Sequence, residues 1–189
     1  MALPAVEVYA DIAAPIEQVW DLVSDISLMP ALSTELQCVE WVEGFDEPCL
    51  GAQFLGTNRH AAIGVWTTHS HITEFDPPRA FEWAVGNPEG PAAVWRFDLA
   101  PATDRTRLRY SARLGPGKSG VTMMIEREPD RAGQIVDGRM RQWEAGMQAV
   151  VAGLKAIAES PRAAREPGTS TATTSSSRPR SVVWPCRRP

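Results

Sequence analysis

The sequence predicts an α+β fold in which a curved antiparallel sheet of about seven strands wraps around a long C-terminal helix. Three observations support this prediction. Strand-like runs follow one another with short breaks rich in Gly, Pro, Asn and Asp, as in an antiparallel meander. The apolar pattern takes a long helical period only after the last of these runs. No helix separates the six consecutive runs, which excludes alternating βαβ units.

The chain opens with a predicted strand and two short helices. Apolar and polar residues alternate over Val6–Ile12, which is typical of a half-buried strand. Apolar residues then recur at helical spacing from Ile16 to Val23. Pro15 suits the first turn of this helix, because the N–H that proline lacks would have no partner there. A second short helix is expected near Ser27–Thr34.

Six further strands are predicted from runs bounded by turn residues. They span Leu36–Glu43, Gly51–Arg59, Ile63–Phe75, Ala80–Gly86, Ala92–Leu99 and Thr106–Leu114. Since alternate residues of a strand share a face, these runs give the sheet one aromatic face and one charged face. An antiparallel sheet can be wet on one side, so only the aromatic face must be covered.

A long helix is predicted over Pro129–Glu159, and it is the element available to cover that aromatic face. Its apolar stripe consists of Met140, Trp143, Met147, Val150, Leu154 and Ile157. The preceding segment Val121–Ile125 is expected to be a helical turn or a lid over one end of the sheet.

Composition divides the chain into one domain over residues 1–160 and a disordered tail over 161–189. The tail consists largely of Ser, Thr, Pro and Arg, and it cannot bury enough apolar surface to offset its ordering entropy. Residues 1–160 contain 13 basic and 22 acidic side chains, a net charge of about −9. Nucleic-acid binding requires clustered Lys and Arg, so no nucleic-acid partner is expected for this domain.

The expected location is the cytoplasm. No stretch approaches the roughly 20 apolar residues of a membrane-spanning helix. The first residues also lack the basic and apolar segments of a secretory signal. Neither feature determines the oligomeric state, and a homodimer is left open.

The opening motif resembles that of the START/Bet v1-like (SRPBCC) superfamily, in its polyketide cyclase/dehydrase and lipid-transport group. The motif consists of the alternating strand followed by Ala14, Pro15, Val19, Trp20, Leu22 and Asp25. The Gly51–Phe54 turn and strand, Asn58 and Trp66 also look familial, and the similarity covers about residues 3–160. Actinobacterial members often share the Trp-rich strands. The resemblance implies a helix-grip fold with a cavity beneath the last helix.

Strand alternation and the helical stripe together predict the residues that would contact a ligand. They are Phe54, Asn58, Trp66, Thr68, Ser70, Phe81, Trp83, Trp95, Phe97, Tyr110, Met140, Trp143 and Met147. This pattern alone is more typical of an ordinary core, and it is the resemblance that favours a cavity. Ligand sites are mostly apolar with a few placed polar groups, here Asn58 and Tyr110 among others.

Three functions remain open at this point. The first is a carrier or sensor of a small hydrophobic molecule, such as a lipid, a quinone or a polyketide-like aromatic. The second, implied by the resemblance, is a polyketide cyclase/dehydratase-type enzyme, with Tyr110, Asn58 and Arg59 as candidate catalytic residues. The third is a protein-interaction module that uses the charged sheet face or the basic tail.

Neither a metal nor a cofactor is expected. The three Cys form no C-x-x-C pair, and no nucleotide-binding glycine motif or nucleophile elbow occurs. His69 and His71 share the outer face of a predicted strand, and no third metal ligand accompanies them. His60 falls in a predicted turn and is expected to be a surface residue.

Overall fold

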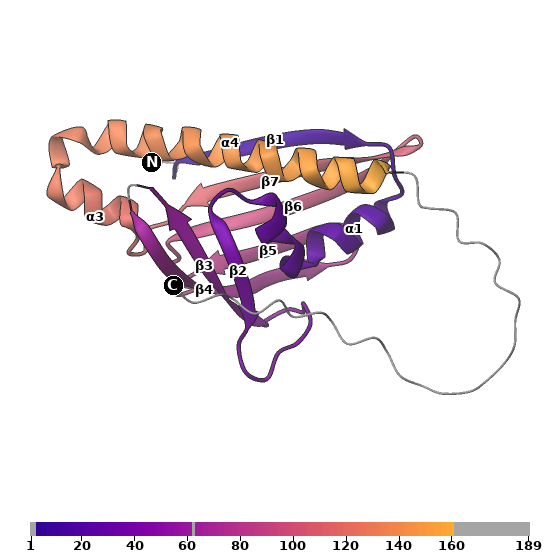
Figure 1. The fold of residues 1–189 in the computed structure, drawn as a ribbon, viewed down its shortest axis with the longest axis horizontal. Coiled ribbons are helices and arrows are strands. Elements are labelled where there is room, and N and C mark those ends of the chain that lie inside the picture. Colours follow the sequence, from indigo (N-terminus) through magenta and orange to yellow (C-terminus); the bar gives the residue numbers. More distant parts are fainter. Residues whose placement is uncertain (1–2, 62, 161–189) are drawn as a thin grey trace, which may run out of the picture. The chain divides into compact units, whose positions relative to one another are not determined.

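A seven-stranded antiparallel sheet forms the body of the protein, shown in Figure 1 as a computed structural model that describes residues 3–61 and 63–160. The strand order is β1-β7-β6-β5-β4-β3-β2, so every strand from β2 to β6 pairs with the next along the chain, and β7 also pairs with β1. The strands are β1 (Ala5–Ile12), β2 (Leu36–Trp41), β3 (Gln53–His60), β4 (Gly64–Asp76), β5 (Ala80–Val85), β6 (Ala93–Ala102) and β7 (Arg105–Leu114). The predicted meander is therefore confirmed.

Helices occur after β1 and after β7, as predicted. They are α1 (Ile16–Ser24), the 3₁₀ turn η1 (Ile26–Leu28), α2 (Met29–Leu32), α3 (Gly120–Arg127), the 3₁₀ turn η2 (Pro129–Arg131) and α4 (Ala132–Glu159). In Figure 1, α4 runs alongside β1, and α3 folds back at one end of the sheet. Ser119 and Thr122 form a reciprocal capping box at the start of α3, which explains why this segment is a full helix rather than one turn.

The strand boundaries differ from the prediction by up to three residues, and the largest difference is at the end of β6. The β6 strand was expected to end at Leu99, but its pairing with β7 continues to Ala102 opposite Arg105. Beyond Asp98, β6 has no further pairing to β5. Pro101 therefore lies where one side of β6 is unpaired. Proline is tolerated there, because no neighbouring strand needs the N–H that it lacks. Asp104 closes the tight turn with a positive φ of 56°.

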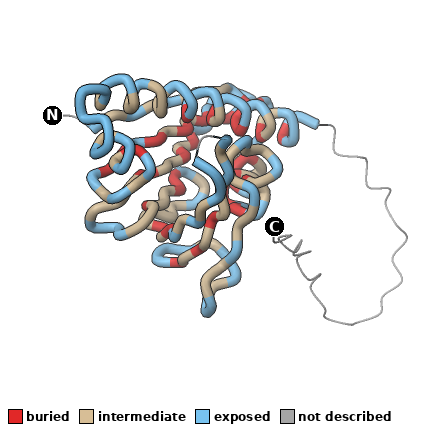
Figure 2. Tube along the Cα trace, turned by 60° about the vertical axis from the view of Figure 1, so that its left-hand side comes forward, coloured by how far each residue is buried: buried red, intermediate tan, exposed pale blue. Residues whose placement is uncertain are grey.

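The aromatic and charged faces are separated as predicted. Buried residues gather where the sheet and α4 face each other (Figure 2). On the opposite face, Arg96 forms hydrogen-bonded ion pairs with Glu74, Glu82 and Asp98. His69 and His71 stack on this outer face with their ring centroids 4.6 Å apart, and partial burial lowers the pKa of His71.

Two predictions concern membranes and the C-terminal tail. Within residues 3–61 and 63–160, no helix is long and apolar enough to cross a membrane. The predicted disordered tail over 161–189 lies outside the described residues, as does any docking function assigned to it.

Candidate ligand-binding cavity

A cavity of about 830 Å³ lies between the aromatic face of the sheet, α4, and the segments around α2 and α3. This volume is in the range of small-molecule sites. Four tryptophans line it, Trp66, Trp83, Trp95 and Trp143, and they come from four different elements. Three of these rings form a continuous surface, because Trp95 lies 6.4 Å from Trp83 and 4.9 Å from Trp143 between ring centroids.

Most of the residues predicted to contact a ligand lie in the wall of this cavity. They are Phe54, Asn58, Trp66, Thr68, Ser70, Trp83, Trp95, Tyr110, Trp143 and Met147. Strand alternation brings the first eight together, because β3 to β7 all turn the same face inward. The last two project from α4.

Phe81 and Phe97, also predicted to contact a ligand, do not line the cavity, and the structure buries both completely in the core. They lie opposite each other in the β5–β6 ladder. Phe81 also packs edge-on against Phe75, which in turn packs against Trp20 of α1. The packing of α1 on this part of the sheet separates the rings of Phe81 and Phe97 from the cavity. The sequence does not show which part of the sheet α1 will cover.

Met140 is likewise outside the cavity wall, although it belongs to the apolar stripe of α4. A helix turns about 100° per residue, so Met140 and Arg139 point in directions that differ by that angle. The wall includes Arg139, Gln142 and Gly146. The cavity therefore lies against the middle of the stripe, where Trp143, Met147 and Val150 also line it, and along the neighbouring small and polar edge.

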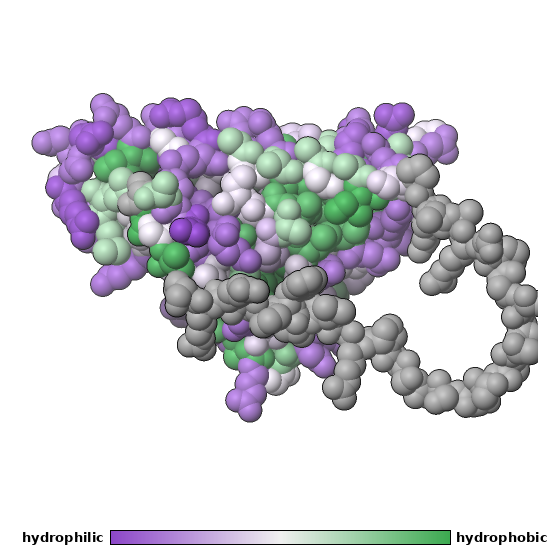
Figure 3. Space-filling model, in the orientation of Figure 1, coloured by the Kyte–Doolittle hydropathy of each residue, from purple (hydrophilic) through white to green (hydrophobic). Residues whose placement is uncertain are grey.

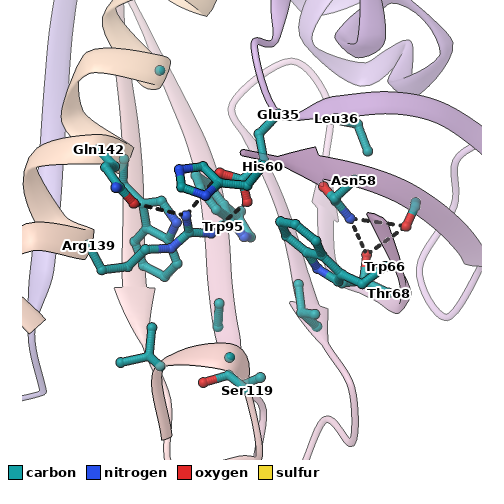
Figure 4. A pocket seen from close by; sticks show the side chains of 18 of the residues that line it. Glu35, Leu36, Asn58, His60, Trp66, Thr68, Trp95, Ser119, Arg139 and Gln142 are labelled. Atoms are coloured by element: carbon teal, nitrogen blue, oxygen red, sulfur yellow. Dashed lines mark hydrogen bonds and ion pairs between the residues drawn. The ribbon is translucent and has the colours of Figure 1, made fainter. Parts of the chain in front are cut away.

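Arg59, one of the three predicted catalytic candidates, lies apart from the other two, Asn58 and Tyr110. It is exposed and does not line the cavity, because it alternates with the inward-facing Asn58 on β3. The Asn58 amide nitrogen donates to the Gly56 carbonyl oxygen at 3.1 Å and to Thr68 Oγ1 at 3.3 Å. Thr68 Oγ1 in turn donates to the same Gly56 oxygen at 3.2 Å. Asn58 and Thr68 therefore form a fixed polar spot in the wall (Figure 4).

Tyr110 contributes a second polar group to the wall. Its ring stacks on Phe97 with centroids 4.1 Å apart, and burial raises the pKa of its phenol. At neutral pH the Tyr110 hydroxyl is therefore a neutral donor that a ligand acceptor can engage.

Sequence reasoning missed a charged cluster on the α4 side of the cavity (Figure 4). Arg139 donates through Nη1 to Glu35 Oε2 at 2.9 Å and through Nη2 to Glu35 Oε1 at 2.6 Å. Gln142 Oε1 lies 3.4 Å from the same Nη1. The two charged residues are 104 positions apart in the chain, so no local pattern could reveal their pairing.

His60 also lines the cavity, and its prediction as a surface residue in a turn is wrong. The β3 strand extends one residue further than expected and pairs His60 with Gly64. Because His60 is two residues from Asn58, it shares the inward face of the strand. Gly64 begins β4 opposite His60 with a positive φ of 90°, a conformation that glycine adopts readily.

The described residues contain no group of three or more His, Cys, Asp or Glu placed to hold a metal ion.

Apolar side chains of the cavity wall reach the surface at α3, where Met123 and Met124 are exposed and also line the cavity (Figure 3). The arrangement can enclose an apolar molecule and offer it hydrogen-bonding groups at a few places.

Comparison with protein families supports this description. Residues 4–159 match the family described as polyketide cyclase/dehydrase and lipid transport. A comparison with curated proteins found no significant match.

Solved structures show the same fold. A polyketide-cyclase-like protein of Corynebacterium glutamicum is 28% identical, with a TM-score of 0.59 over 81% of this chain and 90% of the other. The Zhui aromatase/cyclase of Streptomyces sp. R1128 is 17% identical, with a TM-score of 0.60 over 84% and 97%. A major latex-like protein of Panax ginseng is 9% identical, with a TM-score of 0.58 over 84% and 99%.

Proposed function

Because the chain belongs to the polyketide cyclase/dehydrase and lipid-transport family, we propose that it binds a small hydrophobic molecule in its cavity as a carrier or sensor. A lipid, a quinone or a polyketide-like aromatic has the required chemistry. The observation that carries the proposal is the large cavity lined by four tryptophans. Burial of apolar ligand surface stabilises a complex by roughly 25 cal/mol per Å² before association costs.

Native mass spectrometry of protein purified from its source, followed by solvent extraction, tests this proposal. The expected result is a bound apolar molecule that solvent removes. Titration with a panel of lipids, quinones and aromatic polyketides is expected to change the tryptophan fluorescence. Trp95→Phe is expected to reduce that change, whereas Trp20→Phe, outside the cavity wall, serves as the matched control. A protein that is always empty and insensitive to the whole panel would refute the proposal.

The alternative is a cyclase or dehydratase that acts in the same cavity. Tyr110 favours it, because a neutral hydroxyl in an apolar wall would orient and polarise a substrate carbonyl. On a poly-β-keto substrate, Tyr110→Phe or Asn58→Ala is then expected to lower turnover about a hundred-fold. Wild-type rates in both variants would exclude this assignment and leave the carrier function.

A further inference from the structure

The charge of the cavity wall is opposite to that of the domain around it. The wall contains three cationic side chains, Lys118, Arg131 and Arg139, and a single carboxylate, Glu35. Residues 1–160 as a whole carry a net charge of about −9. Cations concentrated in a cavity of an acidic domain favour an anionic group on the occupant.

Arg139 is the cation that the fold holds in place. Its side chain is 13% exposed, and its guanidinium carbon lies 5.2 Å from the ring centroid of Trp143. A guanidinium over an indole face is attracted by the ring quadrupole. Arg131, by contrast, is exposed and forms an ion pair with Glu128. Arg139 therefore presents a pre-oriented fork beside an aromatic surface.

Glu35 occupies this fork from a segment that lies along α4. Leu32 packs so closely on Gly153 that a Cβ there would be 2.6 Å from Leu32 Cδ2. Seven residues before Gly153, Gly146 faces Thr34. Seven residues before that, Arg139 forms the ion pair with Glu35. The segment from Leu32 to Glu35 thus covers one edge of α4 and ends in the ion pair.

We propose that Arg139 is the headgroup site for an amphipathic carboxylate and that Glu35 is its internal competitor; this inference rests on the proposed function. An arginine fork binds a carboxylate through two parallel hydrogen bonds. Exchange of one carboxylate for another keeps the buried guanidinium paired throughout. Glu35 is 25% exposed, so its side chain can return to water. The apolar body of the ligand then lies against Trp143 and Trp95.

Calorimetry of the full-length protein with dodecanoate and 1-dodecanol tests this site, because the two probes share the same alkyl chain. Wild-type protein is expected to prefer dodecanoate. Arg139→Gln is expected to weaken dodecanoate binding about ten-fold and to leave 1-dodecanol within about two-fold. Glu35→Gln is expected to have the opposite effect and to strengthen dodecanoate binding a few-fold, because the fork loses its competitor.

Two controls separate a headgroup site from a structural ion pair. Arg141→Gln makes the same change of charge at an exposed residue of α4 outside the wall and is expected to change neither affinity. Should Arg139→Gln fail to fold because Glu35 is left alone, the double variant Glu35→Gln/Arg139→Gln removes both charges and is expected to bind the two probes equally well.

Several results would overturn the inference. Equal affinities of the wild type for both probes, unaffected by Arg139→Gln, would refute the headgroup site and leave the proposed cavity function intact. Parallel shifts of both probes in the Arg139 and Glu35 variants would show that the ion pair only holds the segment on α4. Binding of neither probe, nor of any member of the fluorescence panel, would refute the proposed function itself.

Discussion

The two ends of the inner sheet face carry similar aromatic residues, yet one end is filled and the other is hollow. At the α1 end, Trp20 packs on Phe75 with ring centroids 5.3 Å apart, and Phe81 and Phe97 are completely buried. At the α3 end, Trp83 and its neighbours face a cavity of about 830 Å³. Hollowness is therefore decided by what lies opposite the strands, and not by the strands themselves.

The opposing elements differ in the size of the side chains they present. The α1 helix inserts a large indole, whereas the cavity-facing edge of α4 includes Gly138, Gly146 and the charged Arg139. A glycine contributes no side chain, and an arginine held by Glu35 is kept from collapsing onto the sheet. The following predictions test how far the two ends differ.

The largest expected effect is on stability at the filled end. Phe81→Ala is expected to lower the free energy of unfolding by about 3–5 kcal/mol, since it opens a new cavity in a close-packed region. Trp66→Ala, in the cavity wall, is expected to lower it by less than half as much, because one side of that ring already faces open space. Urea titration measures both values. Equal losses would contradict the comparison.

Removing a hydrogen bond at the filled end is also expected to lower the stability of the fold more than removing a hydroxyl from the cavity wall. Thr106 is fully buried and donates through Oγ1 to the Ala14 carbonyl oxygen at 2.8 Å. Thr106→Val is expected to destabilise the protein by about 1–3 kcal/mol, because that carbonyl loses its partner. Ser70→Ala is the matched change in the wall and is expected to be nearly neutral. The thermal midpoints of the two variants give the comparison, and a larger loss in the Ser70 variant would reverse it.

Filling the hollow end should impair binding without harming the fold. A Cβ at Gly138 would meet no other atom within 4 Å, so Gly138→Phe can project into the cavity. We expect ligand affinity to fall about ten-fold, with no loss of stability, since glycine is a poor helix former. Gly133→Phe, on α4 but outside the wall, is the control. Equal affinities in the two variants would show that ligands bind elsewhere.

The smallest effect concerns pH at the filled end. The Ala13 N–H donates to Glu159 Oε1 at 2.7 Å and lowers the pKa of that carboxyl, whose ordinary value is 4.5. A lowered pKa in the folded state stabilises the protein above pH 4.5, and the contribution is lost as the pH falls through the folded value. Glu159→Gln is therefore expected to be less stable than wild type at pH 7 and closer to it at pH 3. A difference that is constant across unfolding curves at both pH values would contradict this linkage.

Local periodicity predicted the secondary structure and the tryptophans of the cavity wall. Side chains alternate across a strand and recur every three or four residues on a helix, so Trp83, Tyr110 and Trp143 could be assigned to inner faces without coordinates. The same rule explains the one misplaced histidine. The β3 strand continues to His60, opposite Gly64, and this changes the environment of His60.

Relations between distant elements could not be predicted in this way. The rotation of α4 about its axis placed Arg139 in the wall and Met140 outside it, although the two are adjacent in the chain. The position of α1 removed Phe81 from the cavity, and the segment before β2 brought Glu35 to Arg139. Amino-acid order alone determined which faces are apolar, since the period of a strand or helix is a local property. Tertiary packing alone decided where those faces meet and where they leave a space, because that depends on contacts between residues far apart in the chain.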